Sequence, residues 1–266
     1  EPRLNALKWS EITKQSPGLK IGYPGQHLAS IVTGMQGKRS GARGDDLEDG
    51  TEVKSCNRVD QLDTCKSCKS KVFRVETECS SCGSTDIDRK EDSKWLFTIR
   101  SKDDLDLLLN GTPRILLALA DYPNFESGDF ETLRFSVYEI WNGVDRHIRF
   151  GEIMTNYLTE IYGGHKKLNV EKTPAPKNFW PFSYQFYLCN PVKVFSAIVT
   201  KANSTPTVEV QLFVDPSADR ATLTPDAMPT TLLSGDEFGV LAQTAPVELL
   251  EQHLAVGYSF EMFRDL

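Results

Sequence analysis

No apolar run in this sequence approaches the roughly 18 residues of a membrane-spanning helix, and no basic, apolar leader for secretion is visible. Glycine and proline number only 18 and 14 among 266 residues, which excludes collagen-like and low-complexity chains. Internal repeats are also lacking. The chain begins with Glu1 rather than methionine, so the expectation of no export signal covers only the printed residues. What remains is one large globular domain, or one domain with an appendage, long enough to bury a core.

Charge is unevenly distributed along the chain, whose net charge is −7. Residues 206–266 hold two basic and ten acidic side chains, whereas residues 1–43 hold seven basic and two acidic ones. A basic front and an acidic tail are typical of a protein that meets an anion on one face only. Chance unevenness on a solvated surface would give the same pattern.

The clearest motif is a pair of Cys-x-x-Cys units separated by ten residues. Four thiolates on two tight turns match tetrahedral zinc, and the unit resembles a zinc ribbon. A pair of disulfides is disfavoured because no export signal is visible, while an iron–sulfur or redox role is the other alternative. Because all four positions are cysteine, the zinc would be structural. The ligands are Cys65, Cys68, Cys79 and Cys82. The remaining two, Cys56 and Cys189, are expected to be ordinary buried thiols.

Just before the ribbon, two acids and a lysine are expected to converge. Asp49 and Gly50 form a strong hairpin turn signal. On the second arm Glu52 and Lys54 share a face because strand side chains alternate, and Asp46 can reach that face across the turn. Two carboxylates bind Mg2+ through hard oxygen ligands. A neighbouring lysine can position or deprotonate a water, or stabilise charge on phosphorus.

This pattern resembles the PD-(D/E)xK motif of restriction-endonuclease-like nucleases, with Asp46, Glu52 and Lys54 as its members. The short spacing is similar to that of mismatch-repair nicking enzymes of the MutH type. Residues 22–55, continuing into the ribbon, resemble the MamI-type restriction endonucleases, and the resemblance covers roughly residues 1–100. The proline that usually precedes the first Asp is absent. Asp45 occupies its place and is an alternative first metal ligand to Asp46.

The resemblance implies a type II restriction endonuclease that hydrolyses phosphodiester bonds in double-stranded DNA. Asp46 and Glu52 would hold catalytic Mg2+, Lys54 would assist, and the four-cysteine unit would hold structural Zn2+. A homodimer, with each copy cutting one strand, and a cytoplasmic prokaryotic location are also implied. Two alternatives stay open: a nicking repair endonuclease or junction resolvase of the same fold, or a non-catalytic zinc-ribbon protein that binds nucleic acid.

A helix is predicted from residue 23 to about residue 33, with Pro24 in its first turn and Gly34 as its stop. In related nucleases this helix points a polar side chain toward the metal site. Gln26 matches that position, and its carbonyl would hold a water there. A surface glutamine is the equally acceptable alternative.

Two basic stretches are candidates for contact with DNA. The glycine-rich loop at residues 37–44 carries Lys38, Arg39 and Arg43, whose cations would neutralise phosphates while the glycines allow close approach. The second stretch follows a predicted helix and carries Lys166 and Lys167. A mobile solvated loop is the alternative for the first. The aromatic residues at 179–182 are expected to pack in the core rather than stack on bases.

The predicted fold class is α/β: a restriction-endonuclease-like mixed β-sheet core flanked by helices, with an inserted zinc ribbon. The nuclease core would span residues 1–205, the ribbon 62–88, and an acidic segment for packing or dimerisation 206–266. The strand at 93–100 is expected to pair with the catalytic hairpin, and Lys94 would approach the site from it. The other expected elements are strands at 114–120, 132–141, 184–200 and 207–213, and helices at 105–109 and 150–161.

Overall fold

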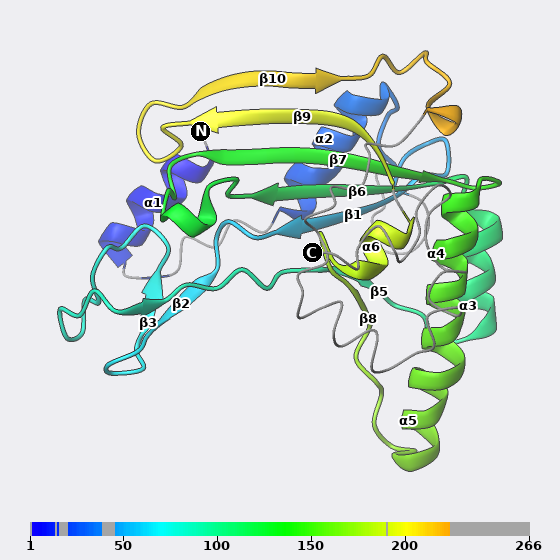
Figure 1. The fold of residues 1–266 in the computed structure, drawn as a ribbon, viewed down its shortest axis with the longest axis horizontal. Helices are drawn as coiled ribbons and strands as arrows, with labels where there is room; N and C mark the ends of the chain where they lie inside the picture. The colour runs from blue at the N-terminus through cyan, green and yellow to red at the C-terminus, as the bar shows by residue number, and fades with distance from the viewer. Residues whose placement is uncertain (1, 14, 16–20, 39–45, 190, 224–266) are drawn as a thin grey trace, which may run out of the picture.

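The structure, a computed structural model, describes residues 2–13, 15, 21–38, 46–189 and 191–223. Its centre is a five-stranded mixed sheet with the order β1-β6-β7-β9-β10. The strands β1 and β6 run parallel, and the remaining neighbours are antiparallel. Helices cover both faces (Figure 1), so the predicted α/β class is confirmed. The bounds are β1 (Glu52–Asn57), β6 (Arg114–Asp121), β7 (Leu133–Trp141), β9 (Val192–Thr200) and β10 (Thr207–Phe213).

The continuous apolar run predicted as a central strand is β6, and all its residues are buried. Its side chains divide between the two faces of the sheet. Leu116 and Ala118 pack with α2 (Gly22–Thr33), while Leu117 and Leu119 pack with an aromatic core on the other face. Burial on both faces explains why this strand reads as uninterrupted apolar sequence rather than as alternation.

On the aromatic face, a column of helices runs away from the end of the sheet (Figure 1). It consists of α4 (Asp145–Asn156), the π-helical segment η3 (Tyr157–Tyr162) and α5 (Gly163–Leu168). The first two confirm the helix predicted at 150–161. The other helices are α1 (Pro2–Thr13), α3 (Lys102–Asp106), η1 (Leu107–Gly111), η2 (Phe125–Ser127), α6 (Tyr184–Cys189) and η4 (Arg220–Thr222). None of the helices in the described ranges is long and apolar enough to cross a membrane.

The cysteine-rich segment forms a small sheet of its own, with the order β3-β2-β4. Its strands are β2 (Leu62–Cys65), β3 (Lys71–Phe73) and β4 (Ile87–Asp88). A buried Asp63 accepts two hydrogen bonds from Arg74, both at 2.9 Å, and one from Arg89 at 2.8 Å. The Arg74 guanidinium also lies 5.1 Å from the ring centroid of Phe130. The ribbon is therefore docked on the segment that follows β6, at the end of the sheet away from the helical column (Figure 1).

One strand pairing differs from the prediction. The strand expected at 93–100 is β5 (Trp95–Phe97), and it pairs with β8 (Lys177–Phe179) in a separate two-stranded sheet rather than with the catalytic strand. Its two large side chains are completely buried in the aromatic core, and the Trp95 indole donates to the carbonyl of Ala118 at 3.0 Å. Burial of Trp95 and Phe97 against the face of β6 thus decides where this segment lies.

The expectation of one strand over residues 184–200 is also wrong in its first part, which forms α6 before β9 begins at Val192. Pro191 separates the two, because proline lacks the amide that would continue either element. β10 is the outer strand of the main sheet, although the sequence assigns residues 206–266 to a separate acidic segment. Arg220, further along, is buried against the sheet.

Candidate active site and metal centre

Asp46 lies against the outer edge of β1. Because β1 is the edge strand of the sheet, one side of its backbone pairs with β6 and the other side has no neighbouring strand among the described residues of this sheet. On the free side the amide of Val53 donates to Asp46 Oδ2 at 2.8 Å. The backbone amide of Asp46 in turn donates to the carbonyl of Thr51 at 3.0 Å. The carboxylate is thereby fixed beside the residue that lies between Glu52 and Lys54.

Glu52 and Lys54 occupy the same face of β1 and form an ion pair through Oε1 and Nζ. Their side chains are 22% and 26% exposed, so both are half-buried while still reachable from solvent. Lys54 Nζ lies 5.7 Å from the ring centroid of Phe97, which provides an apolar wall on one side. An ammonium that is partly desolvated in this way interacts more strongly with a nearby carboxylate or phosphate.

Gln26 reaches the same point from α2, where its Nε2 donates to Asp46 Oδ1 at 2.7 Å. Both carboxylate oxygens of Asp46 are therefore held by neutral donors. The helix that carries Gln26 ends at Gly34, whose φ of 70° is the left-handed conformation of a helix C-terminus. The structure thus joins Gln26 to Asp46 by a hydrogen bond and Glu52 to Lys54 by an ion pair, and Asp46 meets the strand of that ion pair at the amide of Val53.

The helix α2 approaches β1 very closely at Gly25. A Cβ placed on Gly25 would lie 1.9 Å from Ser55 Oγ, a distance that real atoms do not adopt. A Cβ on Gly22, in the same helix, would have no atom within 4 Å. The absence of a side chain at position 25 therefore sets the distance between the helix bearing Gln26 and the strand bearing Glu52.

We expect Gly25→Ala to destabilise the protein by about 1–3 kcal/mol, because the helix must shift away from β1. Gly22→Ala is the matched control, and it should leave the melting temperature unchanged or slightly raised, since alanine restricts the unfolded chain more than glycine does. Thermal unfolding of both variants checks this. Equal melting temperatures for the two would show that the helix does not need glycine at position 25.

The remaining predicted site residues fall into three groups: one beside the site, three outside the described residues, and two on α5. Lys38 lies next to the site, since its backbone amide donates to the carbonyl of Asp46 at 2.9 Å. Arg39, Arg43 and the alternative ligand Asp45 lie outside the described residues. Lys166 and Lys167 are on α5 at the tip of the helical column, and Lys166 Nζ donates to the carbonyl of Val170 at 2.8 Å. The structure therefore does not bring these two lysines to Asp46.

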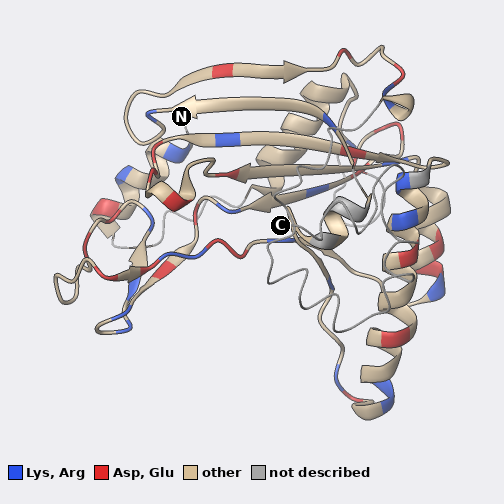
Figure 2. Cartoon of the chain, in the orientation of Figure 1, with Lys and Arg blue, Asp and Glu red and all other residues tan. Residues whose placement is uncertain are grey.

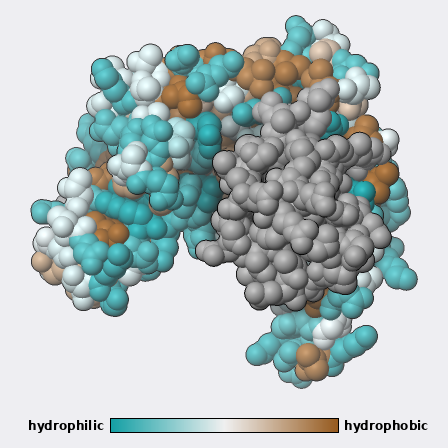
Figure 3. Space-filling model, viewed as in Figure 1, coloured by the Kyte–Doolittle hydropathy of each residue, from teal (hydrophilic) through white to brown (hydrophobic). Residues whose placement is uncertain are grey.

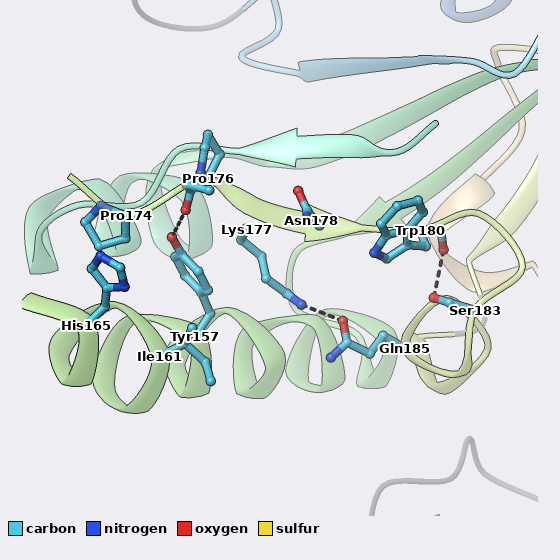
Figure 4. A pocket seen from close by; sticks show the side chains of 11 residues that line it. Tyr157, Ile161, His165, Pro174, Pro176, Lys177, Asn178, Trp180, Ser183 and Gln185 are labelled. Carbon is cyan, nitrogen blue, oxygen red and sulfur yellow. Dashed lines mark hydrogen bonds between the residues drawn. The ribbon is translucent and has the colours of Figure 1, made fainter. Parts of the chain in front are cut away.

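Lys94, expected to approach the site, lies over the ring of Trp180, 4.4 Å from its centroid. Trp180 borders a cavity of about 600 Å³ between β8 and the helical column (Figure 4). In this cavity Lys177 Nζ donates to Gln185 Oε1 at 2.6 Å, and burial lowers the pKa of Lys177. These contacts assign Lys177 and Trp180 to packing between β8 and its neighbours. Phe179 is fully buried, which confirms the expectation that this aromatic residue packs in the core.

A buried polar network, which no pattern in the sequence predicts, surrounds the turn before β1. Arg114 donates to Thr51 Oγ1 at 2.9 Å, to Asp49 Oδ2 at 2.6 Å and to Glu139 Oε1 at 3.2 Å. Arg220 donates to the same oxygen of Glu139 at 2.8 Å. Two features of the sequence could have indicated this network. Glu139 is a charged residue within an apolar strand pattern, and Arg114 is an arginine at the start of the apolar run of β6. Neither observation identifies a partner.

The four ribbon cysteines form one cluster, with sulfur atoms all within 4.8 Å of one another. Cys65 Sγ is 3.7 Å from Cys82 Sγ, and Cys68 Sγ is 3.6 Å from Cys79 Sγ. Four sulfurs at about 2.3 Å from a tetrahedral zinc lie about 3.8 Å apart, so the cluster has the size that the ion requires. Hydrogen bonds from Ser70 lower the pKa of Cys68 to about 6, whereas hydrogen bonds with the neighbouring thiols raise the pKa of Cys82 to about 12.

The two cysteines outside the ribbon are both buried. Burial raises the pKa of Cys56 to about 12, and it also raises the pKa of Cys189. A buried thiol whose pKa is raised stays protonated and is a poor nucleophile at neutral pH. Their location confirms the expectation of ordinary buried thiols.

Comparison with known proteins extends the similarity beyond the motifs. The family model of the MamI restriction endonuclease matches residues 8–231. The type II restriction enzyme MamI of Microbacterium ammoniaphilum is 43% identical over 56 residues, which are 21% of this chain. The aligned stretch covers only 18% of the length of that enzyme. No solved structure matches this chain significantly.

Proposed function

Because the chain belongs to the MamI restriction endonuclease family, we propose that it is a type II restriction endonuclease that hydrolyses double-stranded DNA with Mg2+. The observation that carries the proposal is that Asp46 accepts from the amide of Val53, which lies in β1 between the ion-paired Glu52 and Lys54. A parallel neighbour strand and helices on both faces support a restriction-endonuclease-like core. Homodimerisation, with each copy cutting one strand, belongs to the same proposal.

The donor set fits a magnesium ion. Asp46 and Glu52 offer hard carboxylate oxygens, and each carboxylate oxygen has more than one lone pair. The hydrogen bonds from Val53 and Gln26 therefore orient Asp46 without exhausting its acceptors. When bound, Mg2+ would polarise the scissile phosphate and lower the pKa of water. We assign the ion to Asp46 and Glu52.

The protein side chains then have distinct roles. Lys54 is paired with Glu52, and a cation on Glu52 would compete for that carboxylate and free the ammonium. Lys54 Nζ would then donate to the phosphate as negative charge develops there, or hold the attacking water. Gln26 donates through Nε2, so its carbonyl oxygen is left to accept from a water at the site.

The ribbon is the best-placed second contact with the duplex. It carries three exposed lysines, Lys66, Lys69 and Lys71, and Figure 2 shows basic residues on its loops. Figure 3 shows that the described surface on the ribbon side of the molecule is largely hydrophilic. Strand β1 runs about 17 Å from Glu52 to Asn57, and residues 58–61 lie between it and the ribbon strand β2. A duplex lying along β1 would thus meet the ribbon at least about five base pairs from the cleaved bond.

Incubation of the full chain with supercoiled plasmid and unmodified phage DNA in Mg2+ tests the proposed function. We expect discrete fragments whose sequenced ends share one site, and no cutting in EDTA. Open circles alone would favour a nicking repair enzyme or a resolvase instead. Binding without any cutting, in Mg2+ or Mn2+, would contradict the nuclease proposal and favour a zinc-ribbon protein that only binds nucleic acid.

A further inference from the structure

We infer that Arg114 is a positioning residue that acts through Thr51 to set the separation of the Asp46 and Glu52 carboxylates. The inference rests on the proposed function, because it assigns a role at the proposed Mg2+ site. Arg114 opens β6, and its side chain is only 4% exposed. It cannot touch DNA from that position, so any effect on catalysis must pass through the residues it holds.

Arg114 contacts the turn that precedes β1. Its Nε donates to Thr51 Oγ1 at 2.9 Å, and its Nη2 donates to Asp49 Oδ2 at 2.6 Å. The other oxygen of Asp49 accepts from the backbone amide of Thr51 at 3.0 Å. Arg114 therefore holds the side chain of Thr51 directly. The Asp49 carboxylate, which Arg114 also binds, holds the backbone amide of Thr51.

The backbone of Thr51 is connected to both carboxylate residues, Asp46 and Glu52. The Thr51 carbonyl accepts from the amide of Asp46 at 3.0 Å and from that of Leu47 at 3.2 Å. Thr51 also directly precedes Glu52 in the chain. A movement of Thr51 would thus displace the backbone of Asp46 and Glu52 together. Because Thr51 and Leu47 are fully buried, no water is available to replace the lost contacts.

The helix α2 is held by the same network of buried charged groups. Glu139, fully buried, accepts from Arg114 and from Arg220 on Oε1, and from the Trp141 indole on Oε2 at 2.8 Å. Arg220 Nη2 donates to the carbonyl of Val32 in α2 at 2.7 Å. The helix that brings Gln26 to Asp46 is therefore tied to the same carboxylate as Arg114. Charge-assisted bonds between buried groups of this kind hold an arrangement rigidly.

Thr51 offers a matched pair of variants to test the inference. Thr51→Ser keeps the oxygen that Arg114 binds, whereas Thr51→Val replaces it with a methyl group of similar size. We expect Thr51→Val to weaken Mn2+ binding, measured by isothermal titration calorimetry, by about 10-fold to 100-fold, as is found when partners of metal ligands are removed. Thr51→Ser should bind within about threefold of wild type. Thermal unfolding and zinc content check that both are folded.

The rate of DNA cleavage provides a second measurement of the expected loss of metal affinity. The rate of plasmid cutting by Thr51→Val should recover as Mg2+ is raised, because the variant lacks affinity for the ion rather than a reacting group. A partly unfolded enzyme would not recover in this way. If Thr51→Val does not fold, Arg114→Lys serves instead: it keeps a cation near Glu139 but loses the Nε donor, and it should show the same loss of Mn2+ affinity.

Each outcome decides the inference. Wild-type Mn2+ affinity in Thr51→Val, or equal losses in Thr51→Val and Thr51→Ser, would overturn the role of Arg114 while leaving the proposed nuclease site standing. A wild-type protein that binds no Mn2+ and cuts no DNA would instead remove the proposed function, and the inference with it.

Discussion

Lys54→Ala will bind DNA in Ca2+ but cut it at least about a thousand-fold more slowly in Mg2+, because the variant lacks the ammonium that pairs with Glu52. A positioned cation that stabilises charge developing on the phosphate contributes much more in a partly desolvated site than in bulk water. Cleavage of a linear substrate under single-turnover conditions, with binding measured separately in Ca2+, provides the two quantities.

Asp46→Asn should lose cleavage as completely, and for a separate reason. The amide keeps the size of the carboxylate but removes the negative charge that would hold the ion. Lys8→Ala is a matched control for Lys54→Ala, because Lys8 is an exposed lysine on α1, and it should cut at the wild-type rate. Retained cutting by both the Lys54 and the Asp46 variants would reject the assignment of the site to the edge of β1.

Cys65→Ser or Cys79→Ser will release the zinc and unfold the ribbon. The cluster of sulfurs is the main interior of the ribbon, where Val72 is the one fully buried apolar residue of its own core. A structural zinc site contributes about 10–16 kcal/mol in small isolated modules, far more than a ribbon of this size gains from burial. Metal analysis should show zinc falling from one ion per chain to near none, and limited proteolysis should show cleavage within residues 62–88.

Ser81→Ala is the control for the cysteine variants, since Ser81 is an exposed residue between Cys79 and Cys82. It should keep its zinc and its resistance to protease. The main sheet should stay folded in the cysteine variants, because its five strands and the ribbon form separate sheets. An unchanged zinc content in both Cys65→Ser and Cys79→Ser would refute the assignment of these thiols as ligands.

The parts of the protein that could be predicted from sequence are those specified by neighbours in the chain. The helix from residue 22 and its stop at Gly34 follow from local backbone preferences. The buried strand at 114–121 follows from an apolar run, and the clustering of four cysteines from their spacing. Glu52 and Lys54 share a face because side chains alternate along any strand. In each case the relevant residues lie close together in the sequence.

Which distant segments meet depends on long-range packing. The sequence pattern of 93–100 indicates a strand, but its partner depends on where Trp95 and Phe97 can be buried, and that surface comes from residues of β6 and the helices. The bond from Gln26 to Asp46 likewise depends on how closely α2 approaches β1 at Gly25. Arg114, Glu139 and Arg220 could not be connected from sequence, because a buried charge reveals its need for a partner but not the partner's position. Local propensity therefore determined the elements and the chemistry available, and long-range packing determined which side chains were brought together to use it.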